Sequence, residues 1–437
     1  MLVVLDYITL IIGLIISIIA LQKILKSNYS VLHLCVLLFF VIQVFPLFVD
    51  SISDLTVIER RTPYEYVAMT ETTTGILYDI FCVATLLLLL RFGNKFAKRN
   101  AGFRFTPSNR RPNQLVVLLL SLLMFIPLVG VLLSPEPDVY YVFAYFQTQS
   151  YSDYSAPALF HNYVMLFIDY IAFFSIIAYY YLKSGTKRCT VLTFIASCLL
   201  LWVDGKRGFL ALLIVGFIMI DFIKQNSKSY KKLLIKSITL GIVFIAYFVV
   251  YGNLTNKVSE ESSYINYNAY FSREAEVKMS IYSRSLGENS MLPYDGATIV
   301  YDMFAYVPRV FWPDKPYGFF NYLTSFAYYG HGDDFLERSN FQVNIWSEFI
   351  ANFGVLGYIL SVLLVLFIIK KSESSTNKMV KLLGSVFVLT YMFLGFEMIV
   401  MLEFYLWVFF LIKASFSRHP KRRYQSIKIE QNQLNVQ

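Results

Sequence analysis

The sequence predicts an all-α polytopic membrane protein. Of its 437 residues, 57% are hydrophobic and only 15% are charged, whereas a soluble domain carries about 25% charged residues. Apolar runs of about 20 residues, the length that a helix needs to cross a bilayer, recur along the chain. Short basic pieces separate these runs, and no run of like charge is typical of a nucleic-acid-binding arm. We therefore expect membrane lipid, and no nucleic acid, as a partner.

The apolar runs give eleven candidate spans, within a range of ten to twelve. The first run has no Lys or Arg before it and is followed by Lys23 and Lys26. A cleaved signal peptide has the reverse arrangement, so we interpret this run as a retained span. The candidate spans are residues 2–21, 31–50, 73–90, 114–133, 161–182, 189–203, 208–223, 237–252, 347–369, 380–396 and 398–415.

The basic residues predict the orientation of the spans. Alternate connections hold 27 of the 38 Lys and Arg residues and only two acids, Glu373 and Glu430. Cytoplasmic connections of membrane proteins carry such an excess. The N-terminus is therefore expected outside and the C-terminus inside, with a basic tail at 416–437. The inside connections are residues 22–30, 91–113, 183–188, 224–236, 370–381 and 413–437.

Two outside connections are large. Residues 134–160 are acidic and rich in tyrosine, and residues 252–345 form a loop of 94 residues. We found no internal repeat and no low-complexity linker, so residues 1–437 are expected to form one integral membrane domain. The four cysteines lie in apolar segments without metal-type spacing, and we expect no cofactor.

The segment "YVPRVFWPDKP", residues 306–316, places two cations among three prolines. Proline fixes φ and biases the residue before it toward extended backbone, so Arg309 and Lys315 are expected on a rigid turn. A guanidinium suits phosphate oxygens. The alternative is anchoring at the membrane interface, which does not call for three prolines. The side chains expected to stack on sugar rings are Tyr306, Phe311 and Trp312.

The segment "WVDGKRGFLALL", residues 202–213, places Lys206 and Arg207 in a glycine-bracketed turn before an apolar helix. This turn lies on the outside, where cations are less common. Backbone N–H groups at a helix N-terminus also favour an anion. We interpret the turn as a pyrophosphate site; the alternative is a hairpin whose cations only touch lipid headgroups.

Two residues are candidates for a general base. His331 lies between two glycines and near acids on the outside, and a neutral imidazole can accept a proton from a sugar hydroxyl. Glu348, at the mouth of the ninth span, is the second candidate. The pair Asp333 and Asp334 is too short a motif to predict a metal site, so we expect none.

Three motifs together resemble Wzy-type O-antigen polymerases, which are oligosaccharide repeat unit polymerases of the bacterial inner membrane. They are the outer-face turn "GKRGFLALL", the segment "VPRVFWPDKP", and "SEFIANFGVLGYIL" at the start of a late span. The resemblance extends to the plan of many spans with one large, late periplasmic loop. It implies a GT-C-like helical bundle with a periplasmic N-terminus and a cytoplasmic C-terminus.

The resemblance also implies an inverting glycosyl transfer at the periplasmic face. The growing glycan leaves undecaprenyl pyrophosphate and passes to an incoming undecaprenyl-pyrophosphate-linked repeat unit. Such a reaction needs cations for the pyrophosphate and a base for the acceptor hydroxyl. His331 or Glu348 is the expected base. The cations expected to bind the pyrophosphate are Arg207 and Arg309, supported by Lys206, Lys315, Arg284 and Arg338.

Two other functions remain open. An O-antigen ligase uses the same donor with a lipid A–core acceptor, and the sequence separates it poorly from a polymerase. A lipid-linked oligosaccharide flippase or other transporter predicts repeat symmetry and a site near the bilayer midplane, and neither is evident. A chain-length regulator protein is a further candidate partner.

Overall fold

The computed structural model is all-helical across the residues that it describes and divides into two compact units. Unit 1 comprises residues 1–103 and 264–437, and unit 2 comprises residues 104–263. The expectation of one integral domain stays a prediction. The described residues are 2–26, 29–99, 113–148, 155–205, 207–224, 235–243, 246–247, 264, 267–268, 271–286, 290–332, 334, 336, 341–394 and 398–416.

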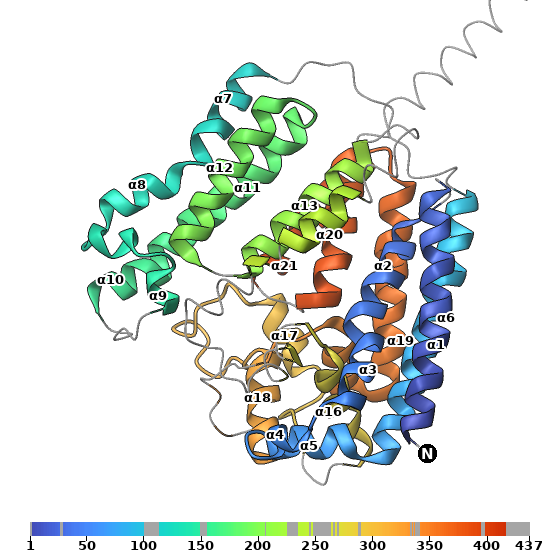
Figure 1. Ribbon diagram of the computed structural model, residues 1–437. Helices are drawn as coiled ribbons and strands as arrows, with labels where there is room; N and C mark the ends of the chain where they lie inside the picture. The colour runs from blue at the N-terminus through green and yellow to red at the C-terminus, as the bar shows by residue number, and fades with distance from the viewer. Residues whose placement is uncertain are drawn as a thin grey trace, which may run out of the picture. The chain divides into compact units, whose positions relative to one another are not determined.

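Unit 1 is built around long apolar helices with shorter helices at one end (Figure 1). Its elements are α1 (Leu2–Leu25), α2 (Val31–Phe39), the π-helical turn η1 (Phe40–Val44), α3 (Phe45–Ile52), α4 (Thr56–Glu59), α5 (Pro63–Thr70), α6 (Thr72–Arg99), α16 (Glu274–Ser285), α17 (Ala297–Met303), α18 (Phe319–Tyr329), α19 (Ile345–Ser374), α20 (Lys378–Leu394) and α21 (Met398–Phe416).

Unit 2 packs its longer helices around α11, which contacts α7, α8, α12 and α13. Its elements are α7 (Gln114–Leu123), α8 (Ile126–Leu133), the 3₁₀ turn η2 (Pro137–Tyr141), α9 (Tyr145–Thr148), α10 (Ala156–Leu159), the π-helical turn η3 (Phe160–Met165), α11 (Leu166–Lys183), α12 (Lys187–Asp204) and α13 (Arg207–Lys224).

The prediction of an all-α chain is confirmed over the described residues, and the apolar helices are compatible with a multi-pass membrane protein. Large apolar side chains cover the outside of α1 and α7, where Val4 is 63% and Leu115 70% exposed; such a surface suits lipid better than water. The number of about eleven spans stays a prediction. The expected span at residues 237–252 lies largely outside the described residues. Within the described part of the chain, six segments are long and apolar enough to cross a membrane. They are Leu2–Leu25, Val31–Ile52, Thr72–Lys98, Gln114–Leu133, Ala156–Lys183 and Ile345–Ser374.

The helices of unit 1 give it two different ends. Helices α1, α19 and α21 carry a basic residue in the last turn, and α6 ends on Arg99. Figure 1 shows these ends on one side of the unit, with α5, α16 and α18 on the other. The segment expected as an outer loop contains the helices α16, α17 and α18 where it is described. The orientation of the chain in the membrane stays a prediction.

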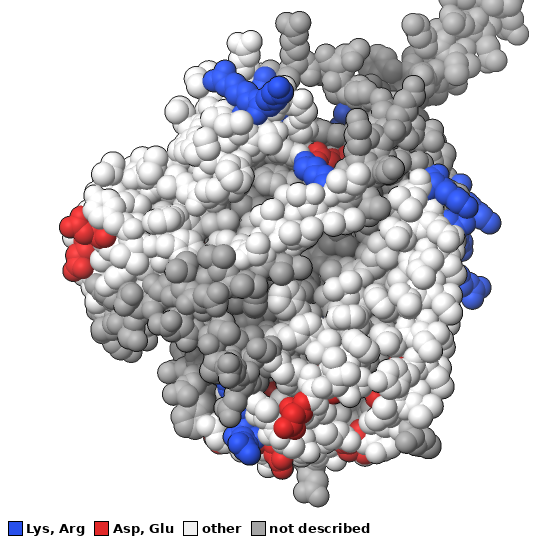
Figure 2. Space-filling view, viewed as in Figure 1, with Lys and Arg blue, Asp and Glu red and all other residues white. Residues whose placement is uncertain are grey.

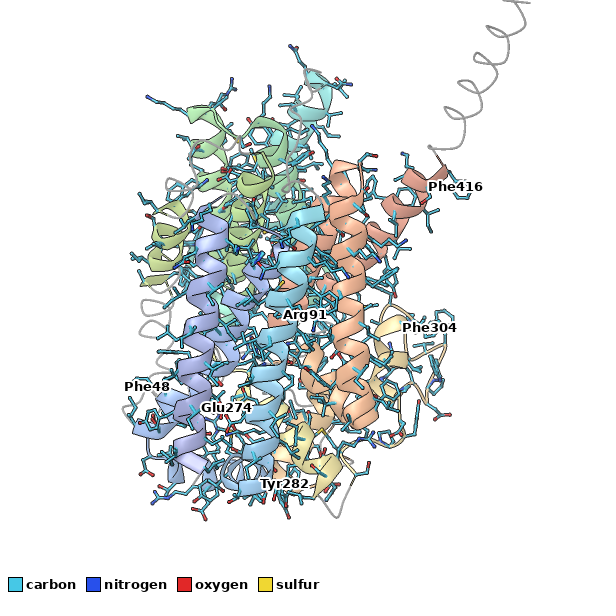
Figure 3. The ribbon with its side chains drawn as sticks, turned by 90° about the vertical axis from the view of Figure 1, so that its right-hand side faces the viewer. Phe48, Arg91, Glu274, Tyr282, Phe304 and Phe416 are labelled. Atoms are coloured by element: carbon cyan, nitrogen blue, oxygen red, sulfur yellow. The ribbon has the colours of Figure 1, made fainter. Side chains whose placement is uncertain are left out.

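Helix α16 is polar in sequence and yet buried. It packs against α19, α5 and α6, and Figure 3 shows Glu274 enclosed among the long helices. Every residue from Glu274 to Ile281 is buried. The Nζ atom of Lys278 lies 2.5 Å from a carboxylate oxygen of Glu274 and 5.2 Å from the ring centre of Tyr78. Paired charges are therefore part of the interior that holds this end together.

Removal of one partner of this buried ion pair tests its role. Lys278→Ala leaves the Glu274 carboxylate without its cation in a buried site, which costs about 3–5 kcal/mol. We expect a clearly lower thermal unfolding midpoint of the purified protein, measured by size-exclusion chromatography after heating. Lys370→Ala, which removes an exposed cation, is the control. The double variant Lys278→Met/Glu274→Gln should recover most of the loss, and a Lys278→Ala protein as stable as the control contradicts the assignment.

Candidate functional site

Lys315 is a buried cation that holds the end of α17. Its side chain is directed at backbone carbonyls of the residues that follow this short helix, and it is only 5% exposed. The ammonium group also lies 4.8 Å from the ring centre of Tyr301. Burial, and the nearby Arg309, lower the pKa of Lys315. The Nζ atom donates to the carbonyl oxygens of Phe304, Ala305 and Val307 at 3.2, 3.0 and 3.0 Å.

Arg309 closes the same segment from the other side. Its guanidinium donates to the carbonyl oxygen of Lys315 at 2.6 Å and to that of Pro316 at 2.9 Å. A longer bond of 3.3 Å reaches the Pro313 carbonyl. The group is stacked on Tyr317, with 3.9 Å between the guanidinium carbon and the ring centre. Residues 306–316 thus form the rigid turn that the prolines predicted, and both cations fasten it internally.

The three aromatic side chains of this turn have different surroundings. Phe311 is 81% exposed, beside the equally exposed Val310. Tyr306 is 44% exposed and lies near Tyr405. Trp312 is half-buried and meets Phe304 edge to face. The exposed tip fits either sugar stacking or insertion into the membrane interface, so both interpretations of the segment stay open.

Arg284 holds a break in α19. The helix is interrupted at Gly354, where φ is 58° and ψ is −134°, a conformation that favours glycine. The break frees the preceding carbonyls from their usual helical partners. The guanidinium of Arg284 donates to the carbonyl oxygens of Ala351, at 2.6 Å, and Asn352. It also pairs with Asp295. Arg284 therefore caps the first section of α19.

His331 lies on a tightly built turn after α18. The helix ends on Gly330 in the left-handed conformation, with φ of 80°. Gly332 passes so close to the Met291 carbonyl that a Cβ atom there would lie 1.8 Å from its oxygen. The Ser325 hydroxyl donates to the His331 carbonyl at 2.9 Å. The imidazole side chain remains 37% exposed, with Nε2 3.5 Å from an Asp334 carboxylate oxygen. The histidine is thus fixed in place, accessible, and near a carboxylate.

Glu348, the second candidate base, is completely buried at the start of α19. It shares a hydrogen bond with Asp302 of α17. Burial, and then the Glu348 charge, raise the pKa of Asp302 well above its usual value. Two carboxyl groups in contact are not both ionised, so the pair shares a proton. The Tyr391 hydroxyl donates to the Glu348 carboxylate at 3.4 Å, and Thr298 also lies against Glu348. This acid pair lies beneath the turn and has no exposed face.

Arg207 is the first residue of α13 in unit 2. The preceding helix, α12, ends on Gly205 in the left-handed conformation, with φ of 69°. This glycine allows the sharp turn into α13 that the sequence predicted. Lys206, Arg338 and the tail after Phe416 lie outside the described residues, as does the Arg207 side chain. Arg207 belongs to unit 2, whereas Arg309, His331 and Glu348 belong to unit 1.

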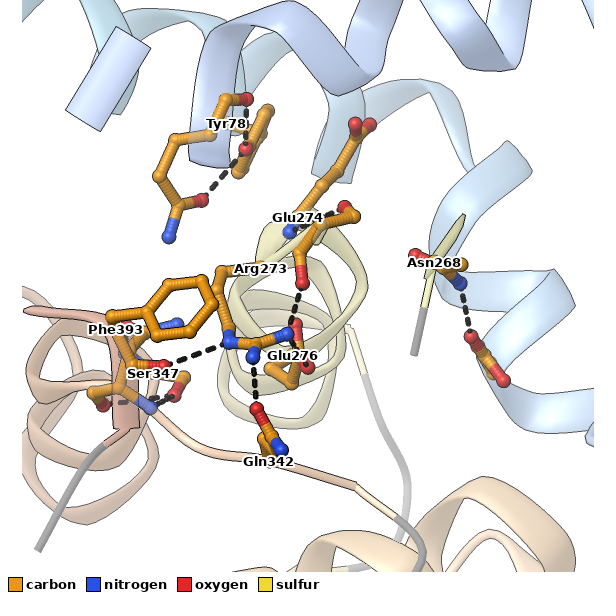
Figure 4. Close-up of polar contacts among 12 residues, drawn as sticks. Tyr78, Asn268, Arg273, Glu274, Glu276, Gln342, Ser347 and Phe393 are labelled. Carbon is orange, nitrogen blue, oxygen red and sulfur yellow. Dashed lines mark hydrogen bonds and ion pairs between the residues drawn. The ribbon is translucent and has the colours of Figure 1, made fainter. Parts of the chain in front are cut away.

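A further guanidinium, that of Arg273, was not predicted from the sequence and is fully buried at the start of α16. It donates to the Phe393 carbonyl at the end of α20, at 2.9 Å, and to Gln342 (Figure 4). It also lies 3.7 Å from the Glu276 carboxylate. The polar string "SREAEVKMS" looks like a solvent-exposed helix, so no sequence signal distinguished it. Arg273 links α16, α20 and the approach to α19.

No family model matches this sequence, and neither the curated proteins nor the solved structures contain a significant match. The candidate site is therefore argued from its own chemistry. Within the described part of the chain, His, Cys, Asp and Glu residues form no group of three that is able to hold a metal ion.

The buried Glu65 of α5 predicts a pH dependence of stability. Its carboxylate accepts hydrogen bonds from Asn268, at 2.8 Å, and from Thr62, and burial raises its pKa to about 7. The folded state therefore retains a proton that the unfolded chain loses above about pH 4.5, so stability falls as pH rises from there to about 7. Thermal unfolding midpoints should fall less steeply with pH in Glu65→Gln than in the wild type.

The exposed Glu59 gives the matched control for this series, because Glu59→Gln changes the same group at the protein surface. Its midpoints should follow the wild-type curve. Identical slopes for Glu65→Gln and wild type between pH 5 and 8 are inconsistent with a protonated Glu65.

Proposed function

We propose that this protein is a lipid-linked oligosaccharide polymerase of the O-antigen type in the bacterial inner membrane. One observation carries the proposal: a polar helical segment, α16–α18, closes the end of unit 1 away from the basic helix ends and fixes His331 in an accessible position. The apolar helices provide surface for polyprenyl tails, and the accessible imidazole of His331 suits the hydroxyl group of an acceptor sugar.

The proposed reaction needs no nucleotide and no cofactor. The acceptor sugar hydroxyl of the incoming repeat unit attacks the anomeric carbon of the growing glycan. The bond from that carbon to the pyrophosphate oxygen breaks, and undecaprenyl pyrophosphate leaves with the electron pair. His331 accepts the hydroxyl proton, and Asp334 stabilises the imidazolium that forms. Attack from the face opposite the leaving group inverts the anomeric centre.

The contacts of the cations indicate two different roles, one structural and one in binding the pyrophosphate. Arg284, Arg309 and Lys315 are bound to backbone carbonyls, so we assign them to shaping the turn and the broken helix. Arg207 begins a helix of 18 residues, where backbone N–H groups and the helix dipole favour a phosphate. We therefore assign the leaving pyrophosphate to Arg207, with Lys206 beside it. Glu348, buried with Asp302, is assigned a structural part.

The direct test uses purified protein and a synthetic undecaprenyl-pyrophosphate-linked repeat unit in detergent. Products longer than one repeat unit, formed without nucleotide or ion gradient, support the polymerase and exclude a transporter. Chelator should leave the rate unchanged. Absence of extension under conditions in which the protein is folded and the substrate is intact contradicts the proposal.

A genetic test separates the polymerase from the ligase. Loss of a polymerase leaves lipopolysaccharide capped with a single repeat unit. Loss of a ligase leaves lipopolysaccharide without any repeat unit, while polymer stays on its lipid carrier. The proposal predicts the first pattern.

Arg207→Ala should lower the rate of chain extension by about 10²–10³-fold, because the developing charge on the pyrophosphate loses a fixed donor. Arg207→Lys should restore only part of the rate, since an ammonium group lacks the planar pair of donors. The rate is measured with the synthetic substrate, and Lys95→Ala, on a basic helix end of unit 1, is the control. Wild-type extension by Arg207→Ala removes the residue from the site.

His331→Ala should lower extension on the order of 10²-fold if the imidazole is the base. Asp334→Asn should act more weakly and shift the pH profile, because the neutral amide no longer favours the imidazolium. Rates over a pH series of the purified proteins check both. A His331→Ala protein with near-normal rates at every pH is not compatible with this role.

A further inference from the structure

Unit 2 contains a cavity of about 500 Å³ between α7, α11 and the start of α12, with polar and apolar walls, within the range of small-molecule sites. It lies at the end of the unit that holds the connection 183–188, which the basic residues place on the cytoplasmic side. The proposed glycan chemistry lies on the other side of the membrane. The polar side chains that line the cavity are Gln114, Ser121, Tyr179, Lys183, Thr186 and Arg188.

The cavity has the charge of an anion site. Lys183 ends α11 and Arg188 belongs to the first turn of α12, and neither forms an ion pair with any residue that the structure describes. No carboxylate lines the cavity. The nearby Asp221 is already bound by Lys236 and by the Tyr180 hydroxyl. Two cations therefore face the cavity without a counter-ion from the described part of this unit.

Two helices begin at the cavity, and both are capped. Asn113 accepts from the N–H of Leu115 at the start of α7, and Thr186 accepts from that of Cys189 at the start of α12. The remaining N–H groups of each first turn, and the helix dipoles, favour negative charge nearby. The N-termini of these two helices therefore add to the positive electrostatic potential of Lys183 and Arg188.

A mostly buried tyrosine side chain without a hydrogen-bond partner in the described part of the chain provides an independent indication of a ligand. Tyr179 is 5% exposed and lines the cavity. No described residue forms a hydrogen bond with its hydroxyl group. Buried tyrosine hydroxyls usually have a hydrogen-bond partner, so a polar group in the cavity would complete it. Apolar side chains, among them Leu118 and Leu192, form the rest of the wall.

We propose that this cavity binds the phosphate headgroup of an anionic phospholipid from the cytoplasmic leaflet. Lys183 and Arg188 contact the phosphate, and Tyr179, Ser121 and Gln114 are placed for its remaining oxygens and for the headgroup hydroxyls. The apolar part of the wall and the exposed leucines of α7 lie against the first part of the acyl chains. Basic pockets between membrane helices on this side are suited to such headgroups. The site is separate from the proposed glycosyl transfer, and its test does not depend on that activity.

The experiment measures lipid binding to the purified full-length protein by native mass spectrometry. Phosphatidylglycerol, cardiolipin and phosphatidylcholine are added in turn, and inorganic phosphate is added in a separate arm. The wild type should retain phosphatidylglycerol or cardiolipin in preference to phosphatidylcholine. Lys183→Gln/Arg188→Gln should bind the anionic lipids about 25-fold more weakly, because each cation near an anionic headgroup contributes on the order of fivefold. Lys187→Gln, which removes an exposed cation from the same turn outside the cavity, should bind as the wild type does.

The outcomes decide the proposal in each case. Equal retention of anionic and zwitterionic lipid by the wild type overturns it, whether or not the double variant folds. An unchanged affinity of a folded double variant, or an equal loss in Lys187→Gln, also overturns it. If inorganic phosphate displaces the lipid, and the double variant no longer binds inorganic phosphate, the cavity is a site for free phosphate instead. Selective loss of the anionic lipids alone supports the phospholipid site.

Discussion

The polar end of unit 1 depends on one constraint: helices that stop or break inside the protein leave carbonyl groups that must find donors. Arg273 and Arg284 meet this need at helix ends, on α20 and α19, and Lys315 meets it at carbonyls of the residues that follow α17. Arg309 does the same within the following turn. A buried carbonyl without a donor costs several kcal/mol where water is excluded. A cation near a helix C-terminus also benefits from the helix dipole. These side chains allow short helices to pack at an angle to the long ones.

The same constraint explains why charged residues accumulate at this end. Cations that hold carbonyls bring their charge into the interior, and nearby carboxyl groups balance it. Glu276 lies beside Arg273, and Glu274 beside Lys278. The interior of this end also contains carboxyl groups that stay protonated, as burial of Asp302 beside Glu348 requires. The result is a rigid polar framework at one end of an apolar bundle, from which His331 projects with part of its ring exposed.

Much of the fold follows from the sequence, because apolar run length and the distribution of Lys and Arg are direct consequences of the bilayer. Each expected span outside 237–252 contains a helix. The rigid turn at 306–316 and the glycine at 205 were also predictable, since proline and glycine act on the local backbone. The roles of Arg284, Lys315 and Arg273 were not. A cation that caps a helix end and a cation that binds phosphate have the same sequence signature, and only the position of the carbonyls distinguishes them.

The central claim is that the diphosphate binds Arg207, while Arg284, Arg309 and Lys315 keep their hydrogen bonds to backbone carbonyls. An electron cryomicroscopy structure of the protein with an undecaprenyl-pyrophosphate-linked repeat unit tests this claim most directly. The account predicts diphosphate density at the guanidinium of Arg207 and intact carbonyl contacts of Arg284, Arg309 and Lys315. Diphosphate density on Arg309 or Lys315, with their carbonyl bonds broken, would contradict it.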